Sequence, residues 1–204
     1  MRTTLYLIRH AQSHPSVKLH HSQWPLSAKG KSQAENLAVL LMPLKIKKIY
    51  SSPYLRCLQT FEPFSKRSGL RLQVEENLHE RLAVIGIVDN FPEIWRKSWE
   101  DFDFALKGCE SSRMALARFS AAVLNISNQN PGSTIAVSTH GNVISLFLNS
   151  IDSAFGIEKA DKMTNPDIFK IIYEEGRPNW DRVFELPEID SIATGHMETP
   201  IDWG

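Results

Sequence analysis

Cysteine is scarce in this sequence: its 204 residues include only Cys57 and Cys109, and no Cys-x-x-Cys pair occurs. Two isolated thiols favour neither a disulfide framework nor a zinc–cysteine site. Long hydrophobic runs are lacking too, since no stretch approaches the roughly 18 apolar residues that indicate a membrane span. The apolar run after Arg2 is too short for a secretory signal and breaks at Arg9. These absences predict a cytoplasmic protein with reduced cysteines and no membrane partner.

Neither sign of charge is in excess. Lys+Arg and Asp+Glu both number 23, so the formal net charge is zero. Without a basic excess, nothing favours nucleic acid or an anionic membrane surface as a partner. The hydrophobic content of 42% supports a real core, and the length suits one domain. We therefore expect a single domain over residues 1–204, in which any anion site is local.

Short apolar runs alternate with amphipathic stretches along the chain. The expected strands cover residues 4–9, 46–50, 70–74 and 134–138, and the expected helices cover 28–42, 111–126 and the stretches that begin at Pro53 and Val143. Near the C-terminus, Ile168–Tyr173 and Arg182–Leu186 are predicted to form a β-hairpin at a sheet edge. The stretch 187–204 is expected to be irregular. Strands that alternate with helices predict an α/β fold with a central sheet.

Charged and polar side chains follow the first strand where its apolar run stops. Leu5–Ile8 is typical of a strand buried on both faces, and Arg9 and His10 come directly after it. In an open α/β sheet, ligands bind at the carboxyl ends of the strands. A guanidinium beside an imidazole there indicates an anionic substrate and a nucleophile or proton carrier. The alternative is a strand that ends at the surface with two solvated polar residues.

Similar side chains follow the other strands. His140 comes two residues after the predicted strand at 134–138. Arg56 follows the second predicted strand and lies in the first turn of the next predicted helix, where backbone N–H groups favour an anion. Glu80 follows the third strand, and like charge from a nearby phosphate would help such a carboxyl keep a proton for a leaving group. Taken singly, His140 is explained as well by a structural histidine, whereas Arg56 and Glu80 are better explained as surface residues.

Five motifs taken together resemble the histidine phosphatase superfamily, the phosphoglycerate-mutase-like enzymes. In chain order they are Arg9–Ala11, Leu26–Ala34, Ser51–Thr60, Leu78–Glu80 and His140–Asn142. Their order and spacing agree with the family from residue 4 to about 186. The resemblance implies a three-layer α/β/α sandwich with a mostly parallel central sheet. It also implies that the segment at about 83–110 is the family's variable cap insertion.

The resemblance implies the catalytic roles. His10 is expected to be the nucleophile that carries the phosphoryl group as a phosphohistidine. Glu80 is expected to protonate the leaving oxygen and then to take a proton from the attacking water. His140 is expected to donate a hydrogen bond to the transferring group.

The same resemblance implies the phosphate-binding residues, which are Arg9, Arg56, His140 and Ser16. Arginines can grip phosphate oxygens in a fork and offset the charge of the transferring group. With that positive charge in place, no metal and no other cofactor is expected. Three histidines in the loop after the nucleophile, His14, His20 and His21, are better explained as solvated loop residues than as metal ligands.

Two features favour a phosphatase that acts on small phosphomonoesters over a mutase. Mutases of this family follow their acid motif with Arg-His-Tyr-Gly, whereas here Arg81–Val84 is largely apolar, and the chain is shorter than the usual mutase. A mutase-type phosphotransferase and a non-catalytic phosphate-binding module remain the alternatives. The cap aromatics, among them Trp95 and Trp99, are expected to pack the cap against the domain or to line an apolar pocket. The physiological substrate and the oligomeric state are not readable from the sequence.

Overall fold

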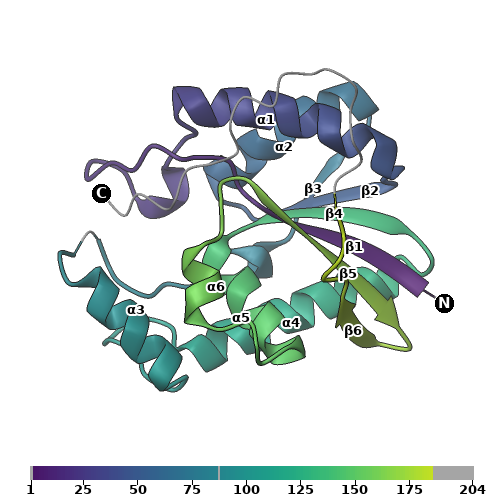
Figure 1. The fold of residues 1–204 in the computed structure, drawn as a ribbon. Helices are drawn as coiled ribbons and strands as arrows, with labels where there is room; N and C mark the ends of the chain where they lie inside the picture. Colours follow the sequence, from purple (N-terminus) through teal and green to yellow (C-terminus); the bar gives the residue numbers. More distant parts are fainter. Residues whose placement is uncertain (1, 87, 186–204) are drawn as a thin grey trace.

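A computed structural model describes residues 2–86 and 88–185 of the chain (Figure 1). Its centre is a six-stranded sheet in the order β3-β2-β4-β1-β5-β6. The four strands from β3 to β1 are mutually parallel, and β5 and β6 continue the sheet in antiparallel fashion. The strands are β1 (Arg2–Arg9), β2 (Lys48–Ser51), β3 (Leu72–Val74), β4 (Thr134–Thr139), β5 (Asp167–Glu174) and β6 (Arg177–Trp180).

Helices cover both faces of this sheet, so the expected three layers are present (Figure 1). The α-helices are α1 (Ala28–Leu41), α2 (Leu55–Ser68), α3 (Phe91–Glu100), α4 (Ser112–Gln129), α5 (Gly141–Ile151) and α6 (Ile157–Asp161). Three short 3-10 helices lie at η1 (His21–Gln23), η2 (Met42–Leu44) and η3 (Glu76–Leu78). The mixed α/β fold with a mostly parallel sheet is confirmed.

The alternation of side chains along β1 separates two cores. Leu5 and Leu7 join a core with α4 and α5, in which the Phe119 and Phe147 rings pack edge to face. Tyr6 and Ile8 point to the opposite face and pack with residues of α1 and α2. A strand covered on both faces has no polar side to expose. This explains the uninterrupted apolar run before Arg9.

The predicted hairpin is present but its second strand was placed wrongly. That strand is β6, Arg177–Trp180, whereas residues 181–185 form a turn and an irregular stretch. Glu175 and Gly176 both have positive φ, 50° and 77°, which is the geometry of a two-residue hairpin turn. The connection is therefore shorter than expected. Leu186 and the stretch 187–204 lie outside the described residues.

Helix starts were predicted to within two residues. The helix expected from Pro53 begins at Leu55, after Tyr54 as its N-cap, and α5 begins at Gly141 rather than Val143. Ser27 caps α1 by accepting a hydrogen bond from the Gly30 backbone N–H, as its position before the helix predicts.

The expected cap segment contains a helix that the sequence analysis did not assign. Trp95 of α3 is buried in the same core as Phe119, and Trp99 packs against that core. The Trp95 indole N–H also donates to Asp161 of α6, at 2.8 Å. Of the two expectations for the cap aromatics, packing against the domain is therefore the one that Trp95 and Trp99 meet.

No helix in residues 2–86 and 88–185 is long and apolar enough to cross a membrane.

The buried Phe119 ring gives a test of the packing. We expect Phe119→Ala to lower the free energy of unfolding by about 3–5 kcal/mol, because a cavity is left between α4 and α5. Met114→Ala on the same helix is the control, since Met114 is 58% exposed and its truncation should change stability by less than about 0.5 kcal/mol. Urea denaturation measures both. Equal effects of the two changes would contradict this description of the core.

Candidate active site

Three parallel strands, β1, β2 and β4, deliver their carboxyl ends to one edge of the sheet. His10 follows β1, Ser52 follows β2 and His140 follows β4, and all three residues are buried. Arg56 comes from the first turn of α2, directly beyond β2. The sheet topology thus brings together residues that lie up to 130 positions apart in the sequence.

The His10 imidazole is fixed in one orientation and one tautomer. Its Nδ1 lies 2.8 Å from the Ala11 carbonyl oxygen, which only accepts, so Nδ1 carries the proton. Its Nε2 accepts a hydrogen bond from Arg56 Nε at 3.0 Å. Burial, and then the charges of Arg56 and Arg9, hold the pKa of His10 well below its usual 6.5. Nε2 therefore presents a lone pair on a neutral ring.

Arg56 joins the two imidazoles. Besides His10, its Nη2 donates to His140 Nδ1 at 3.1 Å, and its Nη1 donates to the His21 carbonyl oxygen at 2.7 Å. The His10 and His140 rings lie edge to face with centroids 5.3 Å apart. A guanidinium cannot accept a hydrogen bond, so both imidazoles offer it a lone pair.

The opposite nitrogen of His140 is held by Ser52. The Nε2 of His140 lies 2.7 Å from Ser52 Oγ. Burial, and then the charges of Arg56 and His10, hold the pKa of His140 well below its usual value. Cys57 Sγ lies 3.4 Å from the same nitrogen, and burial raises the pKa of this thiol to about 12. The thiol is therefore protonated and acts as a packing group.

Arg9 packs against the start of α5. Its Nη1 donates to the Met163 carbonyl oxygen at 2.7 Å, and burial lowers its pKa to about 10. Its buried Nε has no hydrogen-bond partner among the described residues. Gly141 makes this packing possible, because a Cβ there would lie only 3.0 Å from Arg9 Nε.

Glu80 lies at the other side of the α5 start. Its carboxylate accepts hydrogen bonds from the backbone N–H groups of Arg81, Asn142 and Val143, at 2.8, 3.1 and 3.2 Å. The end of a helix that carries free N–H groups favours such a negative charge. Glu80 is thereby held against Asn142 and Val143, the second and third residues after His140.

Within the described part of the chain, no hydrogen bond joins Ser16 to the other predicted site residues. Its hydroxyl accepts from the Lys18 backbone N–H at 3.2 Å, and its carbonyl oxygen accepts from the Trp24 indole at 3.0 Å. Its role toward a phosphate stays a prediction. Nearby, His21 contributes more than a solvated loop residue would, since it also bonds the Tyr54 hydroxyl at 3.0 Å.

The residues that hold His10 in place were missed by the sequence analysis. Thr60 Oγ1 accepts the Ala11 backbone N–H at 3.0 Å, and Asn165 Nδ2 donates to the His10 carbonyl oxygen at 2.8 Å. Thr60 lies one helical turn after Arg56 in the same motif, which is a usable signal. Asn165 lies in a loop with no recognisable pattern.

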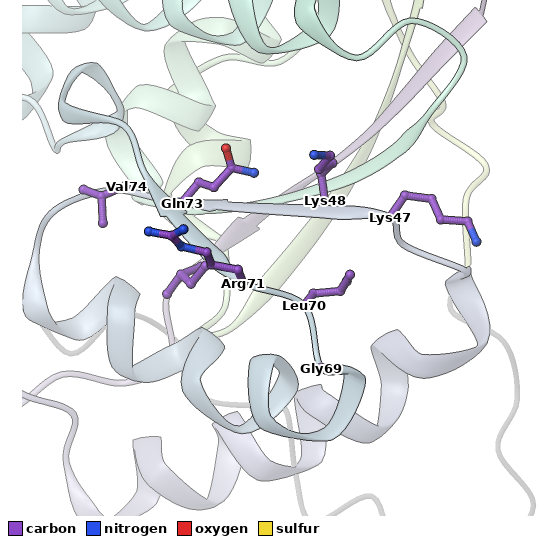
Figure 2. A pocket seen from close by; sticks show the side chains of 8 residues that line it. Lys47, Lys48, Gly69, Leu70, Arg71, Gln73 and Val74 are labelled. Atoms are coloured by element: carbon purple, nitrogen blue, oxygen red, sulfur yellow. The ribbon is translucent and has the colours of Figure 1, made fainter.

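No group of three or more histidine, cysteine, aspartate or glutamate side chains within the described residues is arranged to hold a metal ion. A separate cavity of about 700 Å³ runs along the edge strand β3 (Figure 2). Its lining includes Lys47, Lys48 and Arg71, and none of the residues around His10. Arg71 directly precedes the short edge strand β3, and Lys47 and Lys48 lie at the start of its neighbour β2; cations beside an edge strand discourage pairing with another chain. This cavity therefore needs no ligand to explain it.

The contact between Gly141 and Arg9 predicts a specific loss of anion affinity. In Gly141→Ala, the added methyl group displaces the Arg9 side chain, while alanine is the better helix former. We expect the Kd for inorganic phosphate to rise about tenfold, the effect of losing one charge-assisted hydrogen bond. Gly156→Ala is the control, because nothing lies within 4 Å of a Cβ there. Calorimetric titration with an unchanged Kd in Gly141→Ala would contradict the placement of Arg9.

The lowered pKa values of His10 and His140 predict a loss of stability in acid. Below about pH 6.5 both imidazoles take up protons in the unfolded chain but not in the folded one, so the free energy of unfolding falls as pH falls. Together the two imidazoles change the free energy of unfolding by up to about 2.7 kcal/mol per pH unit. Urea denaturation at pH 5 and 6.5 measures how much the free energy of unfolding falls with pH. In the double variant His10→Gln/His140→Gln this fall should be smaller by the contribution of the two imidazoles. An equal pH dependence in both proteins would contradict two buried neutral imidazoles.

The fold is shared with known proteins. The family model of the histidine phosphatase superfamily (branch 1) matches residues 5–185. No curated protein sequence matches the chain.

Similar solved structures include a mycobacterial glucosyl-3-phosphoglycerate phosphatase, 21% identical with a TM-score of 0.73, with 89% of this chain and 98% of that chain covered. A phosphoglycerate mutase from Bacillus anthracis is 22% identical with a TM-score of 0.73, with 88% and 92% covered. A phosphoserine phosphatase from Entamoeba histolytica, in complex with phosphoserine, is 22% identical with a TM-score of 0.69, with 88% and 95% covered. At these identities the likeness concerns the fold. With the family match over most of its length, the chain belongs to the histidine phosphatase superfamily.

Proposed function

We propose that this protein is a metal-independent phosphomonoester hydrolase that works through a phosphohistidine on His10. The observation that carries the proposal is the state of the His10 ring. Its Nδ1 is bonded to the Ala11 carbonyl, and its Nε2 lone pair faces the Arg56 guanidinium. A nucleophilic imidazole must be neutral, and burial beside two arginines keeps it so.

Arg56 and Arg9 bind the phosphoryl group in this account. Within the described residues neither forms an ion pair with a carboxylate. Their side chains are instead bonded to backbone carbonyls and imidazoles, which accept hydrogen bonds without carrying a negative charge. When a phosphate binds, its oxygens replace the two imidazoles as hydrogen-bond acceptors of Arg56, and the new bonds are charge-assisted. Ser16 supplies a further contact to the substrate from its loop.

His140 supplies a hydrogen bond to the transferring group once Arg56 has turned to the phosphate. The Ser52 hydroxyl is both donor and acceptor, so it can donate to His140 Nε2 while Nδ1 carries the proton. The His140 Nδ1–H then points a donor at the oxygens on which charge develops.

The reaction proceeds in two displacements. The like charge of the bound phosphate lets Glu80 enter the reaction as the carboxylic acid. In the first displacement, His10 Nε2 forms a bond to phosphorus, the ester P–O bond breaks, and Glu80 gives this proton to the leaving oxygen. In the second, Glu80 takes a proton from water, the water oxygen bonds to phosphorus, and the N–P electron pair returns to Nε2. Inorganic phosphate leaves and the enzyme is restored. No cofactor enters either step.

Hydrolysis is favoured over return of the phosphoryl group to a second position. Residues 82–84 are apolar, whereas mutases of this family carry His-Tyr-Gly at these positions, after the arginine that both share, to help hold their substrate. The similar structures include a phosphatase of glucosyl-3-phosphoglycerate and a phosphatase of phosphoserine, both small phosphorylated molecules, and a phosphoglycerate mutase. A small cytoplasmic phosphomonoester is therefore the proposed substrate class. A mutase or a non-catalytic phosphate-binding module is the competing account.

Phosphate release from an aryl phosphate between pH 5 and 8, with EDTA present, tests the proposal. We expect activity that EDTA does not reduce and that His10→Ala lowers by at least about 10³-fold, since the nucleophile is lost. Asn179→Ala, in the edge strand β6, is a control that leaves activity unchanged. Activity lost to EDTA, or retained in His10→Ala, would overturn the mechanism.

A further inference from the structure

The ion pair between Arg118 and Glu110 is the least exposed of those among the described residues. Its side chains are 15% and 19% exposed, and the contact is bidentate, with Nε to Oε1 at 3.0 Å and Nη2 to Oε2 at 2.9 Å. Two parallel hydrogen bonds of this kind fix the orientation of the guanidinium as well as its position. Neither residue belongs to the motifs discussed above.

The third guanidinium nitrogen of Arg118, Nη1, is hydrogen-bonded to the segment that precedes Glu80. It donates to the carbonyl oxygens of Asn77, at 2.7 Å, and His79, at 3.1 Å. Arg118 lies in the second turn of α4, whose position is fixed by the core around Phe119. The backbone on one side of Glu80 is thus bonded to a rigid element.

Glu110 holds the segment that follows Glu80. The Leu82 backbone N–H donates to Glu110 Oε2 at 3.2 Å, and the Glu110 backbone N–H donates to the Leu82 carbonyl oxygen at 2.9 Å. The Arg81 guanidinium adds a bond to the Glu110 carbonyl oxygen at 3.1 Å. Leu82 and Glu110 lie at the two ends of the cap segment, so these bonds also close it.

We propose that the Glu110–Arg118 pair is the positioning element for the proton donor Glu80. The pair is hydrogen-bonded to the backbone on both sides of Glu80, while the Glu80 carboxylate itself bonds the start of α5. The inference rests on the proposed function, because positioning matters only if Glu80 donates a proton. Misplacement of a reacting group by about 1 Å is enough to lower a rate by up to about 10²-fold.

The leaving group gives a readout that a merely structural role would not move. Phenolate is a poor leaving group and needs a proton, whereas dinitrophenolate departs without one. Loss of proton donation therefore lowers kcat/KM for phenyl phosphate more than for dinitrophenyl phosphate. The ratio of the two kcat/KM values is independent of the fraction of enzyme that is folded.

We expect Arg118→Gln to lower this ratio, phenyl over dinitrophenyl phosphate, by about tenfold, and Glu80→Gln to lower it by about 100-fold. Arg118→Lys, a milder change that keeps the charge but loses the fork, should fall between Arg118→Gln and the wild type. Arg113→Gln is the matched control, since Arg113 lies on the same helix and bonds Asp103 bidentately, but at 66% exposure and away from Glu80. Its ratio should equal that of the wild type.

The outcomes separate the two proposals. A ratio that falls in Glu80→Gln but not in either Arg118 variant overturns the positioning role and leaves the proposed function standing. A ratio unchanged in Glu80→Gln overturns the proton-donor role of Glu80 and the positioning role with it. A wild type without activity on both esters overturns the proposed function itself.

Discussion

Arg56 donates hydrogen bonds to His10 Nε2, His140 Nδ1 and the His21 carbonyl oxygen, and the geometry of the site depends on these three bonds. Because a guanidinium only donates, both imidazoles must be neutral and must turn a lone pair toward it. The parallel sheet serves this arrangement, since it places the ends of β1 and β4 side by side. The start of α2 then lies within reach of both.

In the proposed mechanism, the buried positive charge is the reason why the site selects an anion. Arg9 and Arg56 are nearly inaccessible to water, and burial lowers the pKa of each. Backbone carbonyls from His21 and Met163 satisfy part of their hydrogen-bonding capacity without cancelling their charge. A phosphate dianion cancels the charge, so its binding relieves a cost that folding imposes.

The sequence predicted the parts of this structure in which the pattern of side chains along the chain is itself the signal. The apolar run before Arg9 identified β1, because a strand covered on both faces must be apolar throughout. The second hairpin strand was misplaced because a turn at Glu175 depends on backbone φ, which an apolar run after it does not reveal. The role of Met163 could not be predicted either, since it accepts the Arg9 hydrogen bond through a backbone carbonyl oxygen that any residue would supply. Arg118 bonds two backbone carbonyls besides Glu110, and no motif marks it.

The central claim is that the lone pair on His10 Nε2 takes the phosphoryl group. Its most direct test is mass spectrometry of the enzyme quenched in alkali during turnover of dinitrophenyl phosphate, with the phosphorylated peptide sequenced. The account predicts one phosphoryl group, on His10, that is lost in acid as a phosphohistidine is. A phosphoryl group on any other residue, or steady turnover with no phosphoenzyme in Glu80→Gln and wild type alike, would contradict it.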